Sequence, residues 1–188
     1  MLLLLVSAAM VTVPGEQDGV AFVRDFYLDN SAIIVTAQVI GLAAAVVFLG
    51  FARGLQQSDW VGAGPWVLVS GAMVAGAAVL TAVPPLVLSV VARSAEDEVV
   101  SSVALASDLV DVALFAAIAV FGMAVTVATR STWVRSVSAG VALLSMLRAA
   151  LLVAGNQALE VVAPMAFIVL VLCLSWFCWR WRQPSAPE

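Results

Sequence analysis

The stretch from Val103 to Ala128 reads VALASDLVDVALFAAIAVFGMAVTVA, and it decides what kind of protein this chain can form. Asp108 and Asp111 are its only charged residues. At 1.5 Å per residue, a helix over this stretch is longer than the roughly 30 Å of hydrocarbon in a bilayer. The stretch therefore predicts a transmembrane helix.

The composition of the whole chain agrees with this prediction. Of its 188 residues, 64% are hydrophobic and 11% are charged, and the mean hydropathy is +1.13. A soluble domain is about half apolar and about a quarter charged. Such an excess of apolar residues cannot be hidden in one core, which excludes a soluble globular protein.

Six apolar segments follow one another, and they predict one all-α domain over residues 1–188, a polytopic transmembrane helical bundle of about six helices. The first segment is short. Because a leucine run starts at Met1 with no polar cap, we expect the natural helix to begin about ten residues upstream. The segments cover residues 1–13, 31–51, 65–92, 103–128, 134–154 and 161–179.

Residues 16–30 carry apolar side chains at helical spacing, with charged side chains mostly between them. This pattern predicts a short amphipathic helix on the outer interface that ends at Asn30. Two interpretations are open: the helix covers the outer end of the bundle, or it acts as a lid over a binding site.

The arginines predict the orientation. Arg53, Arg130 and Arg135 lie in gaps on one side of the predicted bundle, together with the tail 180–188, whereas most acidic residues lie in the opposite gaps. Basic residues accumulate on the cytoplasmic side of membrane proteins. We therefore expect a multi-pass protein of the cell membrane with a cytoplasmic C-terminus.

Two features concern helix packing. Pro84 and Pro85 lie in the outer half of the third segment, where they remove helical donors to the carbonyls of Leu80 and Thr81 and predict a kink. Pairs of small residues four positions apart allow helices to approach closely, within one chain or across a dimer. These pairs are Gly71/Ala75, Ala72/Gly76 and Gly41/Ala45.

Only three charges lie inside the predicted spans: Asp108, Asp111 and Arg148. Each costs roughly 2.5 to 3.5 kcal/mol to insert, so each needs a partner or water. The two aspartates share one helix face, and a hairpin between the fourth and fifth segments brings Arg148 to nearly the same depth. With Gln38 and Thr81 they form a polar layer in the outer half of the bundle.

This polar layer has two possible roles. Asp111 and Arg148 can form a salt bridge that fastens the fourth segment to the fifth. Alternatively, the layer surrounds a cavity that is open to the outside and binds a small polar ligand or a lipid headgroup.

The residue inventory excludes several chemistries. The chain has no histidine, which removes His-ligated haem, most zinc chemistry and Ser-His-Asp triads, and it has no lysine for a Schiff base. Cys173 and Cys178 are five residues apart, which on a helix suits neither a disulfide nor a shared metal. The net charge of −4 gives no support to nucleic-acid binding. We expect no catalytic residue, no metal site and no cofactor.

Several short motifs resemble small actinobacterial integral membrane proteins of a domain-of-unknown-function family. They are Phe26-Tyr27-Leu28-Asp29-Asn30 before a helix with Gln38, the Arg53-Gly54-Leu55 exit, the acidic outer loop and Thr132-Trp133-Val134-Arg135. The resemblance covers most of the chain and implies about six helices. It implies no activity. Members of this family commonly have a longer first helix than the one that starts at Met1.

These observations favour a non-enzymatic accessory or structural membrane component, which contacts the bilayer and a membrane-protein partner or a second copy. The alternative is a small transporter or ligand sensor that uses the layer around Asp108, Asp111 and Arg148. A membrane enzyme is the third class, and only Asp108, Asp111 and hydroxyl groups could supply its acid–base chemistry.

Overall fold

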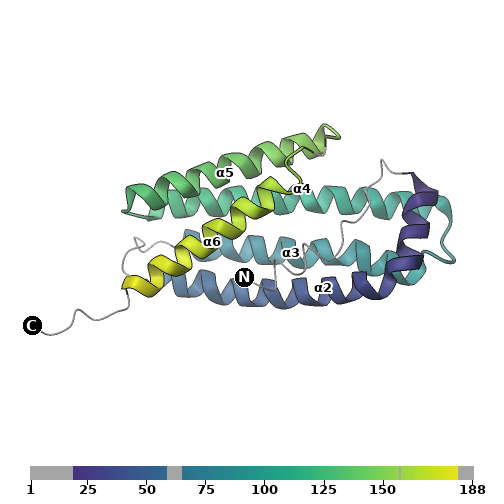
Figure 1. The fold of residues 1–188 in the computed structure, drawn as a ribbon, viewed down its shortest axis with the longest axis horizontal. Helices are drawn as coiled ribbons and strands as arrows, with labels where there is room; N and C mark the ends of the chain where they lie inside the picture. Colours follow the sequence, from purple (N-terminus) through teal and green to yellow (C-terminus); the bar gives the residue numbers. More distant parts are fainter. Residues whose placement is uncertain (1–18, 59–64, 157, 182–188) are drawn as a thin grey trace, which may run out of the picture.

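The computed structural model describes residues 19–58, 65–156 and 158–181, and these residues fold into five helices (Figure 1). All five helices are long and apolar enough to cross a membrane. The predicted all-helical, polytopic architecture is confirmed to this extent, while the first apolar segment, 1–13, lies outside the described residues. The helices are α2 (Val20–Gln56), α3 (Trp66–Val91), α4 (Asp97–Ala128), α5 (Thr132–Val153) and α6 (Val162–Trp181).

Three of the predicted spans match their helices closely, whereas the helix predicted over residues 103–128 is longer than expected. Helices α3, α5 and α6 begin and end within two residues of the expected bounds. Helix α4 begins at Asp97 rather than Val103. Its first turn holds Asp97 and Glu98, and carboxylates stabilise the positive end of a helix dipole. The exposed stretch from Arg93 to Glu98 is therefore a loop over residues 93–96 and a helix start at Asp97 and Glu98.

Helix α2 joins two elements that the sequence predicts to be separate. It runs for 37 residues without a break, and the expected end at Asn30 is wrong. The Asn30 side chain donates a hydrogen bond to the carbonyl of Phe26, 2.9 Å away, so its amide is accommodated inside the helix. In Figure 1 the first turns of α2 run across the end of the bundle before the helix turns along it.

Helices α2 to α5 lie side by side in chain order, and α6 crosses this row obliquely (Figure 1). Three phenylalanines from different helices pack together where α6 crosses the row. The ring of Phe48 on α2 lies 5.3 Å from that of Phe121 on α4 and 5.5 Å from that of Phe167 on α6. Aromatic pairs at these centroid distances add to the energy of area burial. This cluster joins α6 to the row.

Small residues set the distance between neighbouring helices. A methyl group added at Gly71 would lie 2.5 Å from the Cβ of Ala52, so α2 and α3 are nearly in backbone contact there. One added at Gly122 would lie 3.0 Å from both Ala142 and the Ser138 carbonyl of α5. Of the predicted pairs, Gly71 and Ala75 are buried, whereas Ala72 and Gly76 are exposed.

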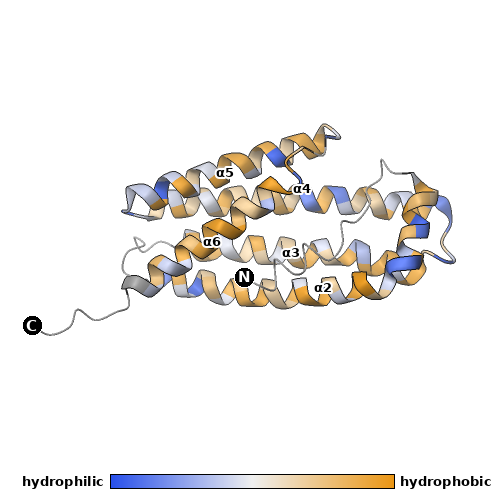
Figure 2. Ribbon diagram, viewed as in Figure 1, coloured by the Kyte–Doolittle hydropathy of each residue, from blue (hydrophilic) through white to orange (hydrophobic). Residues whose placement is uncertain are grey.

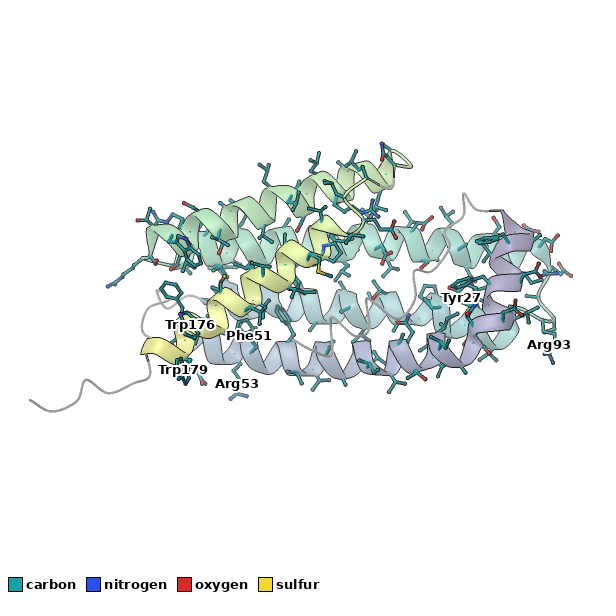
Figure 3. The ribbon with its side chains drawn as sticks, in the orientation of Figure 1. Tyr27, Phe51, Arg53, Arg93, Trp176 and Trp179 are labelled. Carbon is teal, nitrogen blue, oxygen red and sulfur yellow. The ribbon has the colours of Figure 1, made fainter. Side chains whose placement is uncertain are left out.

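The charged residues gather at opposite ends of the bundle. Figure 3 shows Arg53, Trp176 and Trp179 at one end and Tyr27 and Arg93 at the other. We call the first the arginine end, because Arg53 and the α4–α5 connection with Arg130 and Arg135 lie there. The other is the acidic end, and Figure 2 shows hydrophilic residues concentrated on its loop and helix starts. Its acids include Asp25, Asp29, Glu96, Asp97 and Glu98.

Helix α4 has 32 residues and its antiparallel neighbour α5 has 22, so α4 extends about 15 Å farther toward the acidic end. The start of α2 and the end of α3 lie beside this projecting part of α4. We call these three helix ends together the outer extension. Arg24 ties it together with bonds of 2.8 Å to the Asp97 carboxylate and 2.7 Å to the Ala95 carbonyl. Its apolar cluster consists of Val23, Tyr27, Ile34, Leu88, Ala92 and Val100.

The lateral surface of the bundle is apolar. Val46 on α2, Val127 on α4 and Leu143 on α5 are each more than 70% exposed. In water such a surface would drive aggregation. In lipid its exposure costs no hydrophobic free energy, because lipid tails are as apolar as these side chains. The surface thus agrees with the hydropathy of the sequence (Figure 2).

Candidate functional site

Arg148 is the charged residue at the centre of the candidate site, and it is only 5% exposed. Its Nη1 donates hydrogen bonds to the carbonyl oxygens of Asn156 at 3.2 Å and Ala158 at 2.9 Å. Its guanidinium carbon lies 5.9 Å from the ring centre of Phe115 on α4, which is within cation–π range. Arg148 therefore connects α5, the α5–α6 loop and α4.

The backbone after α5 is shaped to present these carbonyls. Asn156 N–H donates to Leu151 O at 2.8 Å and Gly155 N–H donates to Leu152 O at 2.9 Å, which together form a Schellman motif. Gly155 takes the left-handed conformation that this motif requires, with φ of 69°. The Asn156 side chain then accepts a hydrogen bond from Ala158 N–H at 2.8 Å. The loop folds back over the end of α5, where its carbonyls reach Arg148.

The expected ion pair between Asp111 and Arg148 is not formed among the described residues. The guanidinium instead donates hydrogen bonds to the carbonyls of Asn156 and Ala158, because the loop after α5 places these oxygens within reach. A positive charge is also favoured at the C-terminal end of a helix. Arg148 lies level with Phe115 and close enough to Asp111 for the two charges to interact.

Asp111 lies one helical turn from Asp108 on α4, and both carboxylates are half-buried. Asp111 interacts electrostatically with Asp108 and Arg148, and also with Tyr27 of α2. The structure thus brings together three of the predicted polar residues, near the level where α5 ends.

Tyr27 is the site residue that sequence reasoning missed. It is 1% exposed, and its ring packs edge-on against Phe26 at 5.8 Å. Its hydroxyl and the Nε of Arg148 are both buried without a hydrogen-bond partner in the described part of the chain. The spacing of Val20, Val23 and Tyr27 predicted one apolar face of an outer helix, but it contained no information that this face would reach Asp111.

Other residues of the predicted polar layer stay apart from this cluster. The Thr81 hydroxyl donates to the Ala78 carbonyl of its own helix at 2.9 Å. Gln38 is half-buried and forms no hydrogen bond with another described residue. Helix α3 continues through Pro84 and Pro85, both of which are buried, and the kink at these prolines stays a prediction.

The described residues hold no group of three or more His, Cys, Asp or Glu side chains that could bind a metal ion. Asp108 and Asp111 supply two carboxylates, fewer than a hard cation takes from protein in a dedicated site. The donor set fits a small polar or cationic group better than a resident metal.

Comparison with protein-family models finds no match. Comparisons with curated proteins and with solved structures likewise find no similar protein. The functional argument therefore depends on the geometry of this chain alone.

Proposed function

We propose that this chain is a multi-pass protein of the cell membrane that acts as a non-enzymatic accessory component and contacts a membrane-protein partner through the outer extension. The observation that carries the proposal is that this part projects about 15 Å beyond α5 and is held by its own apolar cluster and by the Arg24–Asp97 ion pair. A rigid projection suits recognition because little ordering is needed on binding.

The exposed face of the outer extension has a composition that is suitable for binding a protein partner. Phe22 is 57% exposed and Leu28 is 40% exposed, and Asp25 and Asp29 lie beside them on the same exposed side of α2. Exposed aromatic and aliphatic side chains next to charges are typical of interface centres and rims. With the arginine end in the cytoplasm, as the positive-inside rule predicts, this face is extracytoplasmic.

The proposal is tested by native mass spectrometry of the full chain, extracted gently from its own membrane. We expect a stoichiometric complex with a protein partner that is lost in the double variant Phe22→Ala, Leu28→Ala. The matched control is Val46→Ala, Val47→Ala, which removes two exposed apolar side chains from the spanning part of α2. Equal retention by both variants, or an uncomplexed wild type, would overturn the proposal.

A second candidate, a ligand sensor or small transporter, is favoured by one observation. Among the residues that the structure describes, the buried Tyr27 hydroxyl and Arg148 Nε have no hydrogen-bond partner, and both residues interact electrostatically with Asp111. Unmet donors beside carboxylates are costly unless a ligand or water engages them.

This candidate is tested in liposomes under an imposed proton or cation gradient. Flux that Asp111→Asn abolishes and Asp29→Asn leaves intact supports transport, since Asp29 is an exposed aspartate of the same acidic end. Absence of flux in the wild type together with a stoichiometric partner supports the accessory role.

A further inference from the structure

An apolar groove of about 540 Å³ lies between α3 and α4 on the lateral surface of the bundle, in the half nearer the arginine end. On α3 it is lined by Trp66, Val69 and Met73, which are 72%, 48% and 50% exposed. On α4 it is lined by Val120, Met123 and Val127, which are 45%, 52% and 79% exposed. The sequence pattern did not predict this groove.

The chemistry of the lining selects a hydrocarbon occupant. Apart from the indole N–H of Trp66, its one polar side-chain group is the Ser70 hydroxyl, which donates to the carbonyls of Trp66 at 2.6 Å and Val67 at 3.2 Å within its own helix. The lining therefore offers few groups to a polar ligand. Flexible methionines, Met73 and Met123, adapt well to an irregular chain.

One end of the groove lies beside positive charge. Ala128 lines that end, and the carbonyl of the next residue, Thr129, accepts a hydrogen bond from Arg135 at 3.1 Å. Arg130 follows directly and is exposed. The described residues of the arginine end include no acid that would neutralise these two guanidinium groups.

The depth of the groove matches the orientation of a phospholipid. Trp66 opens α3 at the same end, and exposed tryptophans favour the headgroup level of a bilayer. The groove therefore starts at headgroup depth, beside Arg130 and Arg135, and continues along α3 and α4 into the hydrocarbon. Basic pockets between transmembrane helices on the cytoplasmic side commonly bind anionic headgroups.

We propose that the α3–α4 groove is a binding site for an anionic phospholipid, with one acyl chain against Met73 and Met123 and the phosphate on Arg130 and Arg135. A lipid fits better than a partner helix, because it uses both the apolar groove and the two arginines at its end, which no acid of the described residues neutralises. The site is independent of the outer extension, which lies at the opposite end of the bundle.

The test is native mass spectrometry of the full chain released from vesicles of equal parts phosphatidylglycerol and phosphatidylcholine. We expect a retained lipid adduct enriched in phosphatidylglycerol. Arg130→Gln and Arg135→Gln should each reduce the enrichment about fivefold, from the attraction of one arginine near an anionic surface. Met73→Trp, which fills the groove, should remove both lipid adducts.

Two matched controls make the result interpretable. Arg53→Gln removes an exposed arginine from the same end, on α2, and Val46→Trp enlarges an exposed lipid-facing side chain on α2. Both should leave the adduct unchanged. Equal enrichment of the two lipids in the wild type, or an Arg53→Gln loss as large as that of Arg130→Gln, would overturn the proposal. So would a dimer peak that Met73→Trp removes, since the groove would then be an interface between two copies.

Discussion

Arg148 shows how a single charge can be accommodated inside an apolar bundle without an acidic partner. Its neighbours are two backbone carbonyls and an aromatic face rather than a carboxylate. Hydrogen bonds to a charged donor are stronger than neutral ones, and a ring face adds attraction without introducing a second charge. The predicted ion pair between Asp111 and Arg148 is not formed among the described residues.

Replacing Arg148 by Met should lower the free energy of unfolding by about 2 kcal/mol, because the carbonyls of Asn156 and Ala158 lose a charged donor. The control is Arg135→Met, which removes another arginine–carbonyl bond but from an exposed side chain. We expect the control to change stability by less than about 0.5 kcal/mol. Denaturant unfolding in detergent micelles measures both, and equal effects would show that Arg148 is no anchor.

Tyr27→Phe should leave stability unchanged or raise it slightly, because the hydroxyl is buried without a partner and its removal relieves a desolvation cost. Tyr27→Ala should cost about 3 kcal/mol, because it empties the apolar cluster of the outer extension. Thermal unfolding compares the two. If Tyr27→Phe proves as damaging as Tyr27→Ala, a bound water or ligand must satisfy the hydroxyl.

For single residues, the sequence predicted that Asp111 and Arg148 lie at a common level, but it could not predict the hydrogen-bond partners of Arg148. The common level of Asp111 and Arg148 follows from counting residues along an antiparallel hairpin. The bonds of Arg148 depend on a loop in which Gly155 and Leu159 both have positive φ, with values of 69° and 68°. A positive φ at Leu159 is uncommon for such a residue and cannot be read from a periodic pattern.

At the scale of helices, length and close packing govern the arrangement. Hydropathy identified the spans of α3, α5 and α6, because an apolar run bounded by polar residues has few alternatives. It failed at the start of α2 and α4, where polar residues continue a helix beyond the hydrocarbon. The Asn30 amide is accommodated inside α2 by a hydrogen bond to the Phe26 carbonyl one turn earlier, and Asp97 begins α4, where it pairs with Arg24 of α2.

Gly71→Ala and Gly76→Ala form a matched pair on α3. The first puts a methyl group 2.5 Å from Ala52 and should destabilise the protein by about 1 to 3 kcal/mol, because α2 and α3 must separate. The second meets no described atom within 4 Å and should be neutral or stabilising by up to about 1 kcal/mol through helix propensity. Unfolding in detergent is again the measurement, and equal destabilisation would refute close packing at Gly71.

For the whole molecule, the separation of charge into two ends defines a topology. In a bilayer, the antiparallel helices would place the arginine and acidic ends on opposite faces, and the positive-inside rule predicts which face is cytoplasmic. The row of four helices with α6 across it is also a whole-molecule property. Sequence could not predict it, because the contact of Phe167 with Phe48 and Phe121 joins residues far apart in the chain.

Cysteine labelling checks the topology. In a background with Cys173 and Cys178 replaced by Ser, Ser94→Cys at the acidic end should react with a membrane-impermeant maleimide in intact cells. Gln57→Cys at the arginine end should react only after permeabilisation. Both positions are exposed. The reverse pattern would invert the topology, and labelling of both in intact cells would exclude a spanning bundle.

The bond between Arg148 and the loop after it also has a consequence for biosynthesis. When α5 leaves the ribosome, its arginine costs roughly 2.5 to 3.5 kcal/mol to insert, and the carbonyls of Asn156 and Ala158 are still to be made. We therefore expect the cost of placing Arg148 in the bilayer to fall once the following loop and α6 emerge from the translocon. Translation should deliver these last two helices to the membrane as a pair.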